Sequence, residues 1–232
     1  MKIGIIGAGI TGLSAGYELI KQGHDVVIFE RGAVPGGLGT YIPIGDTAIE
    51  RYYHHFFESD MLIKQYAEEL GISDTLKFYP AKNSIFINNK MYPFSSPKDL
   101  LMYTQLSFID RIVCGITTGF LKFLPFPPTQ LDTIPATQWI KTYAGSRVYK
   151  NLWGPLLEGK FSRFADTVPA LWLWGRVHDR SSKLGYFDGS VKVLFDALIK
   201  KIISSGGTLK LASTITGIES KKDTVLVSEK GK

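Results

Sequence analysis

The sequence predicts an α/β fold in which both ends of the chain contribute to a parallel sheet and a mainly helical segment is inserted between them. Residues 2–6 and 25–30 are short apolar runs typical of buried parallel strands, and residues 11–22 between them have the apolar spacing of a helix. A strand, a helix and a strand within about thirty residues indicate a βαβ crossover. Short strands are also predicted in the stretch TYIPIGDTAIE, and strand-like runs that suit the same sheet return at 208–229, after a mainly helical middle that is rich in aromatic residues.

Turn and cap residues predict where helices and a hairpin begin and end in the middle of the chain. Ser59 and Asp60 can cap a helix that Gly71 ends, and the pair Asn88-Asn89 can turn a β-hairpin. Further helices are predicted over 97–143 with a proline-rich loop near 125–128, over 146–180, and over 191–205. We therefore expect a nucleotide-binding part at 1–75, an inserted mixed α+β substrate domain at 76–185, and a return to the first part at 186–232.

Composition narrows the class of protein. The 232 residues are 44% hydrophobic, which is enough for a sizeable core, and the net charge is +6. Cys114 is the sole cysteine, so no intrachain disulfide can form, and a reducing cytoplasm fits. Basic residues do not alternate with aromatic ones as a nucleic-acid groove requires, and no Cys/His cluster has metal-ligand spacing. We expect no nucleic-acid partner and no metal.

The most apolar stretch of the chain is 100–124, which Asp110, Arg111 and Lys122 interrupt. Such a stretch does not predict a transmembrane helix. Two interpretations remain, a buried pair of helices or an amphipathic surface that contacts a membrane from one side. The sequence leaves the oligomeric state open.

The sharpest motif is the glycine-rich run GAGITG at residues 7–12, which lies between the first strand and the first helix. Gly7 permits a tight turn, Gly9 leaves room for a diphosphate to approach the backbone, and Gly12 lets the helix pack against the strand. The free N–H groups at the helix N-terminus favour an anion there. The expected cofactor contacts are Gly7, Gly9, Ile10, Thr11 and Gly12.

Glu30 ends the second strand, about twenty residues after the glycines, where an acidic side chain can bind the hydroxyl groups of a ribose. A carboxylate at this place disfavours a 2′-phosphate, so NADP is a poor candidate. The fingerprint alone leaves FAD and NAD open.

A second glycine pair follows closely in the stretch ERGAVPGGLGTY. In this the chain resembles the superfamily of FAD-dependent amine oxidases, protoporphyrinogen oxidases and phytoene desaturases. The resemblance implies that Gly36 and Gly37 lie against the FAD, with Arg31 as a nearby polar contact. Leu38 stands where amine oxidases usually have arginine. This GGL form is similar to the desaturase and sugar-mutase branches and puts an amine substrate in doubt.

The resemblance continues through IERYYHHFFESD, WGPLLEGKF and LGYFDGSVKVLFDALIKKIISSGGTL, so it covers most of the chain. These stretches resemble bacterial protoporphyrinogen-oxidase-like proteins. In such flavoproteins a backbone group on the strand after the long helix contacts the adenine. Here the matching stretch is STITGI, with Ile215 as the expected contact, although an ordinary sheet strand explains the stretch equally well.

Three side chains are candidates for catalysis. His54 and His55 lie in an aromatic run that resembles a stretch near the flavin of sugar mutases, and a neutral imidazole there could donate a hydrogen bond or move a proton. Lys160 is a third candidate, by analogy with amine oxidases in which a lysine holds a water near the flavin. The alternatives are a packed or capping histidine and a solvated lysine.

The sequence thus predicts an FAD-dependent oxidoreductase that removes hydride from a C–N or C–C bond of a small-molecule substrate. A flavin-dependent sugar-nucleotide mutase and a non-catalytic dinucleotide-binding module are the alternatives. The resembled proteins usually continue beyond the point that corresponds to residue 232. We therefore expect this chain to be the N-terminal part of a longer protein and to hold FAD weakly by itself.

Overall fold

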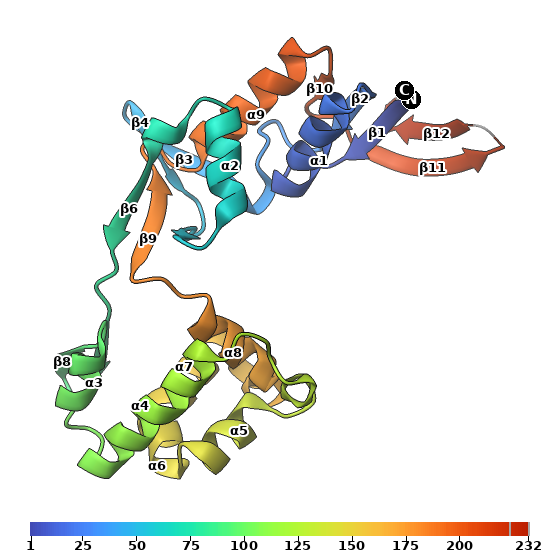
Figure 1. Ribbon diagram of the computed structural model, residues 1–232. Coiled ribbons are helices and arrows are strands. Elements are labelled where there is room, and N and C mark those ends of the chain that lie inside the picture. The colour runs from blue at the N-terminus through green and yellow to red at the C-terminus, as the bar shows by residue number, and fades with distance from the viewer. Residues whose placement is uncertain (223, 232) are drawn as a thin grey trace. The chain divides into compact units, whose positions relative to one another are not determined.

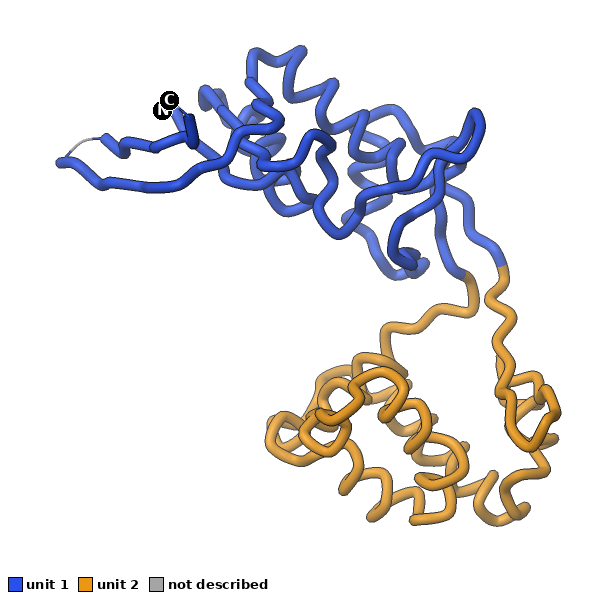
Figure 2. The backbone as a smooth tube through the Cα atoms, turned by 180° about the vertical axis from the view of Figure 1, so that it is seen from behind, with its two compact units in different colours: residues 1–79, 184–232 blue, residues 80–183 orange. Residues whose placement is uncertain are grey.

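The computed structural model describes residues 1–222 and 224–231, and the chain divides into two compact units (Figure 2). Unit 1 contains Met1–Tyr79 and Leu184–Lys232, and unit 2 contains Pro80–Lys183. The N-terminal and C-terminal parts of the chain therefore belong to the same unit.

Unit 1 is built around a three-stranded parallel sheet in the order β1-β2-β10 (Figure 1). The strands are β1 (Lys2–Ile6), β2 (Asp25–Phe29) and β10 (Thr208–Lys210), with α1 (Ile10–Lys21) as the crossover between the first two. The last strand follows α9 (Lys192–Ser204), which packs against α1. The predicted parallel sheet with contributions from both ends of the chain is confirmed.

Two strand predictions are wrong in detail. The sequence predicts a buried strand at 2–6, but β1 lies at an edge of the described sheet and Ile6 is 54% exposed. The buried strand is β2, the middle strand of the described sheet, where Val26 and Ile28 are fully buried in one core with side chains of α1 and α9. The strands β11 (Ile215–Lys221) and β12 (Thr224–Glu229) pair with each other as a separate antiparallel hairpin rather than joining the parallel sheet.

Smaller strands complete unit 1 and lead into unit 2. A hairpin joins β3 (Tyr41–Ile44) to β4 (Thr47–Glu50), and a second sheet has the order β5-β9-β6. Its strands are β5 (Phe56–Phe57), β9 (Lys183–Phe187) and β6 (Leu76–Pro80). The core of unit 1 gathers side chains from the sheet and three helices: Leu13, Tyr17, Val26, Ile28, Tyr66, Phe187, Leu194, Phe195, Leu198 and Ile202.

Unit 2 is mainly helical and contains one hairpin. The hairpin joins β7 (Ser84–Ile87) to β8 (Lys90–Pro93), and its turn residues Asn88 and Asn89 have φ angles of 50° and 58°. Positive φ at both central residues is the type I′ geometry that asparagine tolerates, so the predicted turn is confirmed. The helices are α3 (Pro97–Met102), α4 (Phe108–Phe123), α5 (Ala136–Tyr143), α6 (Ser146–Val148), α7 (Gly154–Phe161) and α8 (Ala170–His178), with a π-helical turn at Tyr149–Trp153.

Serine side chains start two of these helices. Ser96 and Asp99 form a reciprocal capping box at α3, and the hydroxyl of Ser107 accepts a hydrogen bond from the Asp110 N–H at α4. The side-chain cap predicted for α2 (Met61–Glu69) does not form. Asp60 occupies the N-cap position, but its carboxylate accepts from the Phe57 N–H, 2.7 Å away, and makes no side-chain bond to the helix. Among the residues described, no helix has the length and apolarity needed to span a bilayer.

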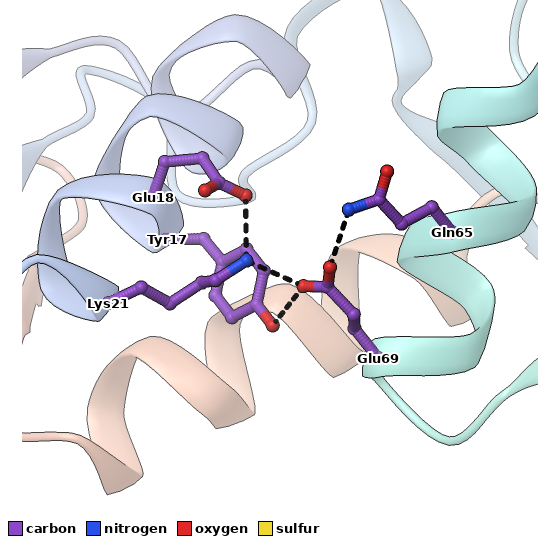
Figure 3. Close-up of polar contacts among 5 residues, drawn as sticks. All are labelled: Tyr17, Glu18, Lys21, Gln65 and Glu69. Carbon is purple, nitrogen blue, oxygen red and sulfur yellow. Dashed lines mark hydrogen bonds and ion pairs between the residues drawn. The ribbon is translucent and has the colours of Figure 1, made fainter.

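A polar network centred on Glu69 joins α1 to α2 (Figure 3). The Glu69 carboxylate accepts from the Tyr17 hydroxyl at 2.9 Å, from Lys21 Nζ at 2.8 Å and from Gln65 Nε2 at 2.7 Å. These hydrogen bonds, Lys21 first, lower the pKa of Glu69 from 4.5 to about 2. The network fixes the position of α2 beside the crossover helix.

Because the pKa of Glu69 is lower in the folded chain than in the unfolded chain, its ionised form stabilises the fold. That contribution is complete above about pH 4.5 and is lost as the pH falls towards 2. We expect Glu69→Gln to lower the melting temperature at pH 7, and the difference from the wild type to shrink as the pH falls through this window. Thermal unfolding followed by circular dichroism at several pH values measures this. A difference that does not change between pH 7 and pH 3 would contradict the assignment.

Candidate functional site

The turn between β1 and α1 is a glycine loop whose shape excludes side chains. Gly7 has a φ of +103°, a conformation that disfavours any residue with a Cβ, and its N–H donates to the Phe29 carbonyl. A Cβ on Gly12 would lie 1.9 Å from the Gly7 carbonyl oxygen. One turn further, a Cβ on Gly16 would lie 2.8 Å from Ile28 Cδ1. The helix therefore packs on the sheet at a distance that only glycine allows.

The second glycine pair packs directly on the first loop. The Gly36 N–H donates to the Ala8 carbonyl at 2.8 Å, and Gly9 and Gly36 form an isolated parallel bridge. A Cβ on Gly37 would lie 3.2 Å from the Gly9 Cα, so the two backbones meet without an intervening side chain. Residues separated by about thirty positions in the chain thus form one continuous backbone surface.

Glu30 lies beside this surface, and its carboxylate accepts hydrogen bonds from the first glycine loop and from the segment that leads to the second glycine pair. One carboxylate oxygen accepts from the Ala8 N–H at 2.8 Å, and the other accepts from the Gly32 N–H at 2.7 Å. The backbone of Glu30 pairs with the returning end of the chain, since its N–H donates to Lys210 and its carbonyl accepts from Ser213. The acidic residue predicted to bind a ribose therefore points towards the glycine loop.

A cleft of about 860 Å³ opens in unit 1 beside the two glycine loops. It falls in the size range of small-molecule sites. Its walls come from the start of α1, from α2 and from the start of α9, and its apolar lining includes Phe56, Ile63, Tyr66, Leu194 and Phe195.

The cleft brings together part of the set predicted from the sequence. The predicted residues that line it are Gly9, Ile10, Thr11, Gly36, Leu38 and His54. Leu38 is 76% exposed at this wall. Gly7, Gly12, Gly37 and Glu30 belong to the adjoining loops. Arg31 is exposed after β2, and Ile215 begins β11 two residues after Ser213.

The three catalytic candidates have different surroundings. His54 Nδ1 lies 2.6 Å from the Tyr52 carbonyl oxygen, while the His55 ring packs between the rings of Tyr53 and Phe57. Lys160 belongs to unit 2, where its ammonium lies 6.0 Å from the ring centre of Trp172. Of the three, His54 is the residue that lines the cleft in unit 1.

Sequence reasoning missed two further contacts in unit 1. The Glu50 carboxylate accepts from the Val191 N–H at 3.0 Å and so holds β4 to the start of α9. The hydroxyl groups of Tyr53 and Tyr186 lie 3.0 Å apart, and burial first, then this hydrogen bond, raises the pKa of Tyr186 to about 12. No local pattern signals either contact, because each joins residues more than 130 positions apart.

Comparison with known proteins agrees with this geometry. Residues 5–70 match the family model of an NAD(P)-binding Rossmann-like domain. The chain is 26% identical over 255 aligned residues to a probable zeta-carotene desaturase of Synechococcus elongatus, which covers 94% of this chain and 51% of that protein. The chain thus spans about half the length of this curated relative.

Solved structures share the fold over nearly the whole chain. A putative protoporphyrinogen oxidase from Exiguobacterium sp. 255-15 has a TM-score of 0.67 and 16% identity, covering 99% of this chain and 56% of that one. A triple mutant of putrescine oxidase has a TM-score of 0.73 and 15% identity, covering 99% and 54%. At these identities the solved structures show a shared fold. The desaturase and oxidase names among the matches agree with the superfamily resemblance expected from the glycine pair, and the glycine loops lie within the matched Rossmann-like region.

The close packing at Gly12 gives a direct test of the loop. We expect Gly12→Ala to destabilise unit 1 by more than about 2 kcal/mol, because the new methyl group overlaps the Gly7 carbonyl. Gly159→Ala is the matched control. Gly159 is exposed in α7, and a Cβ there meets no atom within 4 Å. Alanine at this position should therefore raise the free energy of unfolding by about 0.5–1 kcal/mol. Denaturant unfolding measures both, and equal stabilities of the two variants would contradict the packing described.

Proposed function

We propose that unit 1 binds the ADP part of FAD and that the chain belongs to an FAD-dependent oxidoreductase. The observation that carries this proposal is the side-chain-free surface formed by Gly9, Gly36 and Gly37, with Glu30 beside it. Bare backbone at such a surface allows a diphosphate to come within hydrogen-bond distance of N–H groups.

The start of α1 suits an anion. Its N-cap residue, Gly9, makes no side-chain cap, and the first turn contains no acidic residue. Its N–H groups and the helix dipole therefore remain available to a diphosphate. Thr11 and Ser14 place hydroxyl groups along the same wall of the cleft.

Glu30 would serve the ribose next to the diphosphate. Its carboxylate has two oxygens with several lone pairs, so it can keep its backbone bonds to Ala8 and Gly32 and still accept from a sugar hydroxyl. A 2′-phosphate would bring like charges together at this point. Arg31 directly follows Glu30, and Ile215 lies two residues after Ser213, the backbone partner of Glu30. Both would contact the cofactor.

FAD is favoured over NAD because a second glycine loop packs on the first and because Phe56, Leu194 and Phe195 give the cleft an apolar wall. When bound, the flavin would supply hydride acceptance: hydride would leave a substrate carbon, the neighbouring atom would lose a proton, and the C–N or C–C single bond between them would become a double bond. The wall formed by these side chains would exclude water from the reacting atoms.

His54 is the residue that we assign to hold a proton in the cleft. The Tyr52 carbonyl can only accept, so Nδ1 must carry the hydrogen of that contact. In the neutral ring Nε2 then has a free lone pair that can accept a proton from a ligand. His55, packed between aromatic rings, would orient the segment, and we assign Lys160 no role in the cleft.

A binding measurement tests the cofactor assignment. We expect FAD to bind the purified chain saturably, with ADP as a competitor. Glu30→Gln should weaken binding about tenfold, or about 1.4 kcal/mol, because an amide accepts less strongly than a carboxylate. Quenching of flavin fluorescence measures the affinity. The control is Glu219→Gln, which makes the same substitution at an exposed residue of β11. Binding that ADP does not displace, or that both variants leave unchanged, would contradict the proposal.

An activity measurement tests the reaction class. With FAD bound and oxygen excluded, we expect a tetrapyrrole or polyene substrate to bleach the flavin absorbance and putrescine not to, because Phe56, Leu194 and Phe195 make the cleft wall mainly apolar. His54→Ala should slow bleaching about tenfold or more if it moves a proton, with FAD affinity unchanged. Conversion of a nucleotide sugar by the reduced protein, without bleaching of the oxidised protein by these compounds, would identify a mutase instead.

A further inference from the structure

Helix α4 in unit 2 carries a stripe of large apolar side chains that face solvent. They recur every three or four residues and therefore share one side of the helix: Ile109, Ile112, Ile116, Phe120 and Phe123. Their exposed fractions run from 38% for Ile112 to 84% for Phe123. The opposite side of α4 packs into the core of unit 2 through Cys114 and Leu121. The helix is thus apolar on two sides, and only one is covered within the described structure.

The stripe extends beyond α4 at both ends. Met102 on α3 and Phe108 at the start of α4 are about two-thirds exposed, and Phe126 after the helix is 81% exposed. Towards the C-terminal end the stripe surrounds a hollow of about 420 Å³ that reaches Leu124 and Pro125. An apolar surface of this extent marks an interaction site.

Basic residues lie near both ends of the stripe. Asp110 is the one acidic residue in the sequence of α4, and it is nearly buried and paired with Arg147 at 2.9 Å. Arg111 donates to the Leu101 carbonyl near the start of α4, and Lys122 donates to the carbonyls of His178 and Arg180 near its end. Positive charge therefore flanks the apolar stripe at both ends.

The same asymmetry holds for the whole unit. The sequence of unit 2 contains 13 Lys and Arg against 6 Asp and Glu, a net charge of +7. The remaining 14 basic and 15 acidic residues give unit 1 a net charge of −1. The positive charge of the chain is concentrated in the unit that exposes the stripe.

We propose that the stripe on α4 inserts into the interface of an anionic lipid membrane. The acyl chains of such a membrane would bury the apolar stripe, and its negative headgroups would attract the flanking basic residues. The 16 residues of α4 are fewer than the ~20 that cross a bilayer, so the helix lies in the plane of the interface. A second copy of the chain is a poorer occupant, because it would bring two units of net charge +7 together.

Co-sedimentation with vesicles tests this proposal. One set of vesicles is phosphatidylcholine, and the other is phosphatidylcholine mixed with phosphatidylglycerol. We expect the chain to bind the mixed vesicles about tenfold more tightly, and high salt to reduce the difference. The triple variant Ile116→Gln, Phe120→Ser, Phe123→Ser should lose binding about tenfold or more. These side chains are exposed, so unit 2 should keep its circular dichroism spectrum and melting temperature; if the triple variant does not, Phe123→Ser alone replaces it.

The control removes the same number of exposed apolar side chains from unit 1. Ile42→Gln, Ile44→Gln and Ile49→Gln change three isoleucines of the β3–β4 hairpin that are 45–51% exposed, and vesicle binding should not change. The proposal is wrong if the wild-type chain stays in the supernatant, or if the two triple variants bind alike. It is also wrong if light scattering shows a wild-type dimer that the α4 variant separates, because the stripe would then be a contact between copies.

Discussion

The contact between two backbones at Gly9, Gly36 and Gly37 is the constraint on which the rest of unit 1 depends. Two loops approach closely only where neither has a side chain, and each loop is held by its own element. The first is fixed by the packing of Gly12 on Gly7, and the second by the Gly36 N–H on Ala8. Glu30 then satisfies the Ala8 and Gly32 N–H groups. The cleft exists because these requirements are met together.

The helices that surround the cleft are held by a few polar contacts at long range. Glu69 ties α2 to α1, and Glu50 ties β4 to the start of α9. Both carboxylates accept from donors on another element, so each fixes a wall of the cleft from outside it. The proposed cofactor chemistry therefore depends on side chains that no cofactor would touch.

The two units divide the physical tasks of the chain. Unit 1 carries the glycine loops, the cleft and almost no net charge, whereas unit 2 carries the positive charge and the exposed stripe on α4. The proposed dinucleotide site and the proposed membrane-binding surface place different demands on a sequence, since the first needs small residues and tight turns and the second needs large apolar residues facing outwards. Their separation into units lets each demand be met without compromise.

The sequence by itself determined the parallel sheet, the crossover helix, the glycine loop and the Asn88-Asn89 turn, because each depends on local periodicity or on the φ angles that glycine and asparagine allow. It also placed Glu30 at the close of the second strand, which ends one residue earlier at Phe29, but not its bonds to Ala8 and Gly32. Burial was harder to predict. The apolar composition of β1 indicated a buried strand, yet Ile6 is exposed. For the stretch that forms α4 the sequence left a buried helix pair and an amphipathic surface open, and one side of α4 is exposed.

Only the tertiary structure decided which distant residues meet. The packing of the second glycine pair on Gly9, the position of His54 on the cleft wall and the Glu50 contact with α9 each join segments separated by many positions in the chain. Local pattern carries no information about such contacts. They follow from the way the sheet and its helices close around one core, and that closure is a property of the whole unit rather than of any one segment.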